Sequence, residues 1–112
     1  MSISNLKLKN HTFLNSLLLD PYYPNDLVTK GQKILEELCD KIETTKPESV
    51  VALYILTHEA TNKFNALAEE FMVNNSEIET MAREVIGMDF DLIAEAYDYD
   101  TNSEEIIATR DW

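Results

Sequence analysis

The stretch SEIETMAREVIGMDFDLIAEAYDYD, residues 76–100, decides how the rest of the chain folds. At about 100° per residue its apolar side chains line one face of a helix. Asp89 falls in the middle of that line, and a carboxylate there has either a buried partner or access to a water-filled cleft. The line consists of Ile78, Ala82, Val85, Leu92 and Ala96, flanked by Met81, Ile86, Met88, Phe90, Ile93 and Tyr97.

The remaining apolar residues also recur at helical spacing, and the chain of 112 residues has only two glycines and three prolines. This composition favours helices over a turn-rich β architecture, and the length suits one domain. We predict a single all-α domain resembling a four-helix bundle, with a short C-terminal helix. Because the links are short, successive helices should lie antiparallel. The predicted helices span residues 12–19, 25–43, 48–73, 76–98 and 103–108.

Two positions should fix where helices begin. Thr12 is a candidate N-cap for the 12–19 helix, and Ser76 with Glu79 forms a capping box for the 76–98 helix. Gly31 lies on the apolar face of the 25–43 helix, where it should let a neighbouring helix approach closely.

We expect the two ends of the chain to differ in how firmly they are held against the helices. We expect residues 1–11 to form a loosely held start. The ending Arg110-Asp111-Trp112 carries a tryptophan and a cation beside an acidic half, so it should dock against the helices.

Charge is distributed unevenly along the chain. Residues 1–47 are balanced, whereas residues 48–112 hold the whole net charge of −12. Such a field repels nucleic acids and anionic membranes, and it attracts basic surfaces. We expect no binding to nucleic acid or membrane, and a basic protein is the partner that this charge favours.

The sequence predicts neither a secretory signal nor a membrane span. The apolar run at residues 17–19 is far shorter than a signal-peptide core or a membrane span, and Asp20-Pro21 follows it. Cys39 is the only cysteine and lies in an amphipathic pattern, where a reduced thiol behaves as a small apolar residue. These features predict a cytoplasmic protein.

Asp89 needs a partner, and the 48–73 helix offers several. Thr61 lies within its apolar face, while Tyr54, His58 and Asn65 line one shoulder. If these sides pack together, Asp89 could meet His58, Thr61 or Asn65 in a polar seam. The seam could be a structural network that fixes helix register, a small-ligand pocket, or an acid–base pair in which Asp89 orients His58.

Familiar metal motifs are incomplete. His58-Glu59 begins the zinc motif HExxH, but Asn62 stands where the second histidine is required. A di-iron bundle needs Glu-x-x-His, and Ile55 stands three residues before His58. The segment 98–102 begins like a calcium loop, yet the glycine and the final glutamate of that loop are missing. We therefore expect no metal and no cofactor.

Several segments together resemble a family of small uncharacterised bacterial proteins, a domain of unknown function. The resemblance runs from Leu14 onward and implies a stand-alone bacterial helical domain, with no activity, cofactor or catalytic residue to carry over. The segments are YYPNDLV at 22–28, ILEEL at 34–38, LTHEATNKFNALAEEF at 56–71, SEIETMARE at 76–84 and the ending EEIIATRDW.

Three functions fit these observations. The first is an interaction module that binds a basic partner, as immunity proteins and antitoxins do. The second is a small-molecule-binding protein, or less readily an enzyme, that uses the seam around Asp89 and His58. The third is a self-assembling homo-oligomer. The acidic face proposed for the first function comprises Glu69, Glu70, Glu84 and Asp91.

Overall fold

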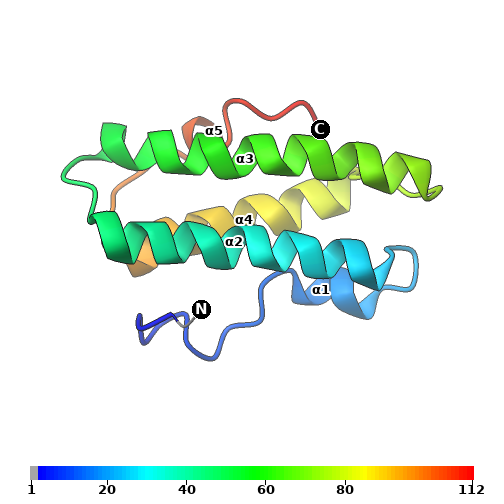
Figure 1. Ribbon diagram of the computed structural model, residues 1–112, viewed down its shortest axis with the longest axis horizontal. Coiled ribbons are helices and arrows are strands. Elements are labelled where there is room, and N and C mark those ends of the chain that lie inside the picture. Colours follow the sequence, from blue (N-terminus) through cyan, green and yellow to red (C-terminus); the bar gives the residue numbers. More distant parts are fainter. Residues whose placement is uncertain (1–2) are drawn as a thin grey trace.

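The long helices α2 (Asn25–Thr45) and α3 (Val50–Val73) lie side by side and antiparallel in the computed structural model, which describes residues 3–112 (Figure 1). The other helices are α1 (Asn15–Leu19), α4 (Thr80–Ala96) and α5 (Ser103–Ile106). Short α1 contacts α2 and α4, and α5 contacts α3 and α4. The described residues contain helices and loops but no strand, which confirms the predicted all-α, bundle-like domain.

Gly31 sets the close packing of α2 against its neighbours. A Cβ atom at this position would lie 2.7 Å from Leu14 Cδ1 and 3.2 Å from Phe64 Cε1. Both of those side chains are buried, so neither has free space to move into. The prediction that Gly31 permits a close approach is confirmed, and the approaching elements are α3 and the residue that precedes α1.

Helix α4 lies behind the α2–α3 pair in Figure 1 and closes the core from that side. Its Phe90 ring packs edge-to-face on Phe64 of α3, with ring centroids 5.9 Å apart. The buried line is rotated from the predicted one, because Ile86 and Ile93 face the core with Phe90. Val85 and Leu92 are half-buried, while Met81 and Met88 are exposed.

The predicted capping box at the start of the fourth helix is wrong. Glu79 itself is the N-cap of α4, and its carboxylate accepts hydrogen bonds from the N–H groups of Met81 and Ala82, each at 3.2 Å. Ser76 is buried instead, and its hydroxyl donates to the Tyr22 carbonyl oxygen at 3.3 Å. The helix therefore begins at Thr80, four residues later than predicted.

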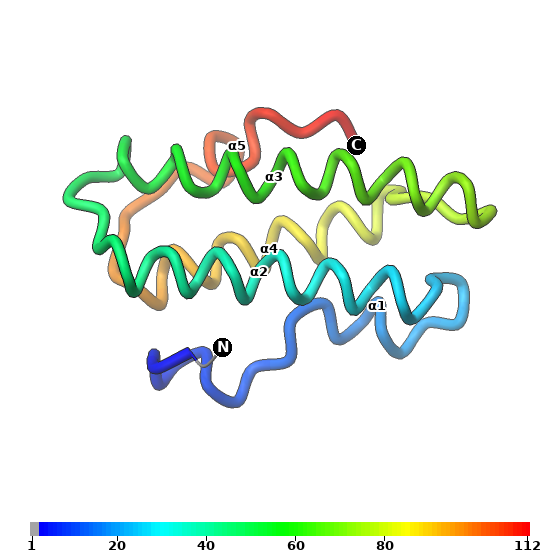
Figure 2. The backbone as a smooth tube through the Cα atoms, viewed as in Figure 1, coloured from blue at the N-terminus to red at the C-terminus, as the bar shows by residue number. Residues whose placement is uncertain are grey.

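The segment before α1 is held against the bundle, which differs from the loosely held start expected for residues 1–11. Leu8 is fully buried, and the N–H groups of Ser4 and Asn5 donate to the Glu43 carboxylate near the end of α2. Figure 2 shows this segment running along the same side of the bundle as α1. For residues 1 and 2, the expectation of a loosely held start lies outside the part of the chain that the structure describes.

The C-terminal residues dock as predicted, and they contact both α3 and α4. The half-buried Trp112 ring lies edge-to-face near Phe64, with ring centroids 6.2 Å apart. Arg83 of α4 donates from Nε to the Trp112 main-chain oxygen at 3.0 Å. Within residues 3–112, no helix combines the length and apolar character that a membrane crossing requires.

Candidate functional site

Asp89 is buried, and both of its carboxylate oxygens are bonded to the N-terminal part of the chain. Oδ2 accepts the Leu14 N–H at 2.7 Å, and Oδ1 lies 2.9 Å from His11 Nε2. Leu14 adopts a left-handed conformation with φ 56°, which a leucine avoids unless its surroundings hold it there. Asp89 therefore anchors the turn that leads into α1.

The structure does not bring Asp89 together with His58, Thr61 or Asn65. His58 lies on the other side of α3, where its Nε2 is 2.6 Å from the Glu105 carbonyl oxygen. The Thr61 hydroxyl donates to the Thr57 carbonyl oxygen at 2.8 Å, within its own helix. The small-molecule hypothesis loses the geometry on which it was based, because its two main residues serve different segments.

The polar shoulder of α3 instead holds the C-terminal segment in place. The Tyr54 hydroxyl accepts the Asn102 N–H at 3.1 Å. The Asn65 amide donates to the Thr109 carbonyl oxygen at 3.1 Å and accepts the Asp111 N–H at 3.0 Å. Tyr54, His58 and Asn65 thus satisfy main-chain groups of a segment that has almost no regular structure of its own.

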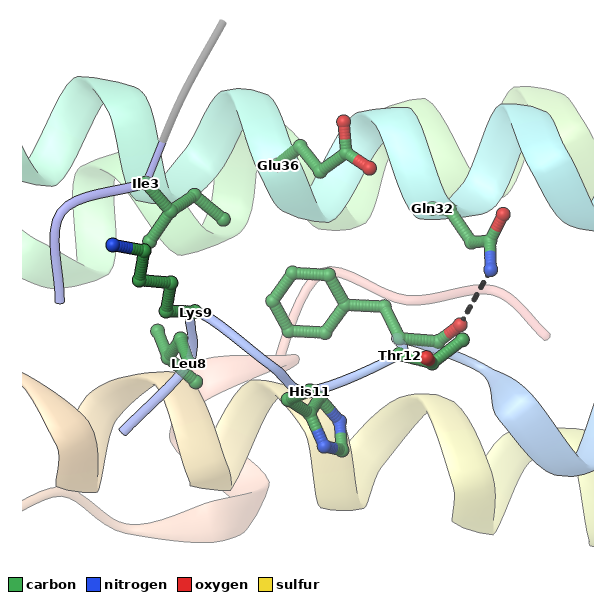
Figure 3. A pocket seen from close by; sticks show the side chains of 8 residues that line it. Ile3, Leu8, Lys9, His11, Thr12, Gln32 and Glu36 are labelled. Atoms are coloured by element: carbon green, nitrogen blue, oxygen red, sulfur yellow. Dashed lines mark hydrogen bonds between the residues drawn. The ribbon is translucent and has the colours of Figure 1, made fainter. Parts of the chain in front are cut away.

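An open cavity of about 450 Å³ lies between α2 and the N-terminal segment (Figure 3). Phe13 is among the residues that line it, and Lys9 and Glu36 lie on its two opposing walls. Gln32 donates to the Phe13 carbonyl oxygen at 2.9 Å and thereby ties the walls together. His11 contributes to the lining, but its Nε2 is engaged with Asp89 on α4.

A second polar cluster joins the end of α2 to the end of α4. Hydrogen bonds to the Glu43 carboxylate lower its pKa to about 2. The largest contribution comes from Ser4, and the next comes from the Tyr97 hydroxyl. Burial raises the pKa of the neighbouring Cys39 thiol to about 12, so this cysteine is a packed, unreactive group. Within residues 3–112, no three His, Cys, Asp or Glu side chains are placed to hold a metal ion.

Three glutamates of α2 and α3 pair with lysines across the helix pair. Lys30 lies 2.5 Å from Glu70, Lys63 lies 3.1 Å from Glu37, and Lys41 pairs with Glu59. Glu70, one of the four residues of the predicted acidic face, is therefore neutralised locally.

The other three residues of the predicted acidic face do not share one surface. Glu69 lies near the docked C-terminus beside Asp111 and Trp112. Glu84 and Asp91 lie together on α4, at the edge of a groove between α4 and α5.

The outward side of α4 combines carboxylates with exposed methionines. Its residues recur at spacings of three and four, and therefore form one stripe along the helix. Met88 is 69% exposed and Met81 is 40% exposed. The stripe, which we call the α4 acidic stripe, consists of Met81, Glu84, Met88, Asp91 and Glu95.

The groove beside this stripe has a volume of about 370 Å³. Its two arginines are already engaged: Arg83 bonds the Trp112 oxygen, and Arg110 lies 3.5 Å from Glu104. The Asp91 carboxylate accepts a hydrogen bond from the Ser103 hydroxyl at 2.9 Å, and within the described residues no cation pairs with it or with Glu84.

The model of the family described as "Family of unknown function (DUF5713)" matches residues 7–112. The chain belongs to this family. The assignment agrees with the resemblance described from Leu14 onward, and it extends the matched region to include His11, the partner of Asp89. No curated protein and no solved structure matches the chain.

Proposed function

We propose that this protein is an interaction module that binds a basic protein partner through the α4 acidic stripe, in the manner of an immunity protein or antitoxin. The observation that carries the proposal is the run of carboxylates and exposed methionines along one side of α4. Three lysine–glutamate pairs join α2 to α3, whereas the carboxylates of the stripe have no cationic partner among the described residues.

Unpaired carboxylates on one helix repel each other, so the free protein gains no stability from this arrangement. A partner with lysine or arginine side chains at matching positions would relieve the repulsion and would be steered toward the stripe during encounter. Met88 and Met81 add apolar area between the charges, and the flexible methionine side chain adapts to varied partner surfaces. Charge would thus guide association, while apolar contact would lengthen the lifetime of the complex.

The experiment is affinity capture from the protein's own host with three forms of the bait. The first is the wild type. The second is Glu84→Lys/Glu95→Lys, which reverses two exposed residues of the stripe. The third is the matched control Asp40→Lys/Glu48→Lys, which makes the same change in net charge at exposed positions outside the stripe.

The expected result is a polypeptide of basic isoelectric point that the wild type and the control retain at low salt and release at high salt. The Glu84→Lys/Glu95→Lys bait should not retain it. If all three baits retain the same polypeptides, or none is basic, the proposal is wrong. Circular dichroism of the three baits establishes that they are equally folded before capture.

A further inference from the structure

Gly87 occupies an unusual place, the middle of α4 on its half-exposed side. Glycine in a helix interior is less favourable than alanine by roughly 0.5–1 kcal/mol. Nothing in the fold requires that loss, because an added Cβ would meet only Ile107 Cδ1, at an ordinary contact distance of 3.8 Å. At Gly31, in contrast, an added Cβ would collide with Leu14 at 2.7 Å. Packing within the described part of the chain therefore does not account for the glycine at position 87.

Gly87 forms part of the groove between α4 and α5. Ile107 is almost fully buried beside it, and the exposed Met88 follows it in sequence. With no side chain at position 87, the main chain of α4 is open to close approach at this point. The groove thus has an apolar part, the slot, at Gly87, Met88 and Ile107, and the groove's polar lining consists of Arg83, Glu84, Asp91, Ser103, Glu104 and Arg110.

We propose that this slot receives an apolar side chain from a basic amphipathic helix of the partner, which lies along the α4 acidic stripe. The inference deepens the proposed function and rests on it. An amphipathic helix offers apolar anchors at i, i+3, i+4 and i+7 with cations on either side, which is the pattern that the slot and its acidic borders complement.

The dimensions of the stripe agree with a helical partner. Glu84 and Glu95 are about 16 Å apart along the axis, at 1.5 Å per residue, which corresponds to three helical turns. A partner helix of about four turns can therefore bring lysines or arginines to both ends of the stripe while one of its apolar side chains lies over Gly87, about one turn from Glu84. Arg83 and Arg110 are each bonded to an acceptor of this chain, the Trp112 main-chain oxygen and the Glu104 carboxylate, which lessens their repulsion of a basic helix.

The test uses a synthetic probe peptide of about 18 residues, with leucine at i, i+3, i+4 and i+7 and lysine elsewhere. Fluorescence anisotropy measures its Kd for the wild type, for Gly87→Leu and for Glu84→Lys/Glu95→Lys. Ala66→Leu, at an exposed position of α3, is the matched control for adding a leucine to a helix surface. Gly87→Ala is a milder variant that should fold at least as well as the wild type.

Amide chemical shifts provide a second readout on the unaltered chain. The protein has only two glycines, so their resonances are readily assigned in a ¹⁵N–¹H correlation spectrum. Adding the peptide should shift the Gly87 resonance and leave that of the buried Gly31 in place.

We expect Gly87→Leu to weaken peptide binding by about tenfold or more, with Ala66→Leu unchanged and Gly87→Ala intermediate. If Gly87→Leu binds like the wild type while Glu84→Lys/Glu95→Lys loses binding, the acidic stripe stands and the slot is refuted. If neither variant changes binding, both the slot and the proposed binding surface are refuted. An unmoved Gly87 resonance in saturating peptide also contradicts the slot.

Discussion

Replacing each glycine by alanine makes the same chemical change at two helical positions with opposite expected effects. At Gly31 the new methyl group would lie 2.7 Å from Leu14 Cδ1 and 3.2 Å from Phe64 Cε1. Leu14 cannot easily move away, because it is buried and its N–H is bonded to Asp89 at 2.7 Å. At Gly87 the nearest atom lies at 3.8 Å, so the methyl group is accommodated.

The magnitudes follow from two opposing contributions. Alanine improves helix propensity by roughly 0.5–1 kcal/mol at either site. Overpacking a closed core costs about 1–3 kcal/mol, and the short contact at Gly31 places it in the upper part of that range. We expect Gly31→Ala to lower the free energy of unfolding by about 1–2 kcal/mol and Gly87→Ala to raise it by about 0.5–1 kcal/mol.

Urea unfolding followed by circular dichroism measures both values. With a slope of about 1–3 kcal/mol per M, the midpoints of the two variants should differ by roughly 0.5–3 M. A double-mutant cycle of Gly31→Ala with Leu14→Ala identifies the contact: removing Cδ1 should make the alanine at position 31 less harmful by about 1 kcal/mol or more. The packing argument is refuted if Gly31→Ala is as stable as the wild type, or if the cycle shows no coupling.

Four further variants test the polar contacts. Asp89→Leu should destabilise the fold by about 1–3 kcal/mol in urea, because it leaves a buried main-chain N–H unsatisfied. His11→Ala should lose less, about 1 kcal/mol or below, since this pair is partly solvated; equal losses would contradict the anchor role. Glu43→Gln should destabilise by about 1–2 kcal/mol at pH 7. Because folding lowers the pKa of Glu43 from 4.5 to about 2, that loss should shrink as the pH falls from about 5 toward 2, and a pH-independent loss would disprove it. Asn65→Ala should release the C-terminal segment and red-shift the emission of Trp112, the chain's one tryptophan; an unchanged spectrum would show that other contacts suffice.

Helix periodicity was sufficient to predict the main elements, because the apolar face of each long helix recurs over many residues. It also placed Gly31 on a packed face and Asp89 on the inner side of α4. The start of α4 was misplaced because Ser76 and Glu79 match a capping box in sequence, whereas Glu79 acts alone and Ser76 turns toward the 20–24 loop.

The partner of Asp89 could not be found from periodicity. His11 is 78 residues away in sequence and lies in a loop, so no helical spacing relates the two. The one available signal was Leu8, Phe13 and Leu14, whose apolar side chains suggest that the start of the chain packs against the bundle.

The role of Tyr54, His58 and Asn65 on the shoulder of α3 could not be predicted for a different reason. These polar residues were correctly placed on one line, but they bind main-chain groups of residues 102–111. Every residue carries such main-chain groups, so sequence alone does not show which ones a side chain will bind.

The most direct measurement of the central claim is the Kd of the captured basic partner as a function of salt concentration. It should be measured for the wild type, Glu84→Lys/Glu95→Lys and Asp40→Lys/Glu48→Lys. We predict that the wild type and the Asp40→Lys/Glu48→Lys control bind with similar Kd and a steep salt dependence, while the stripe variant binds weakly and with a shallower dependence. Equal Kd values and equal salt dependence for all three proteins would contradict the assignment of binding to the α4 acidic stripe.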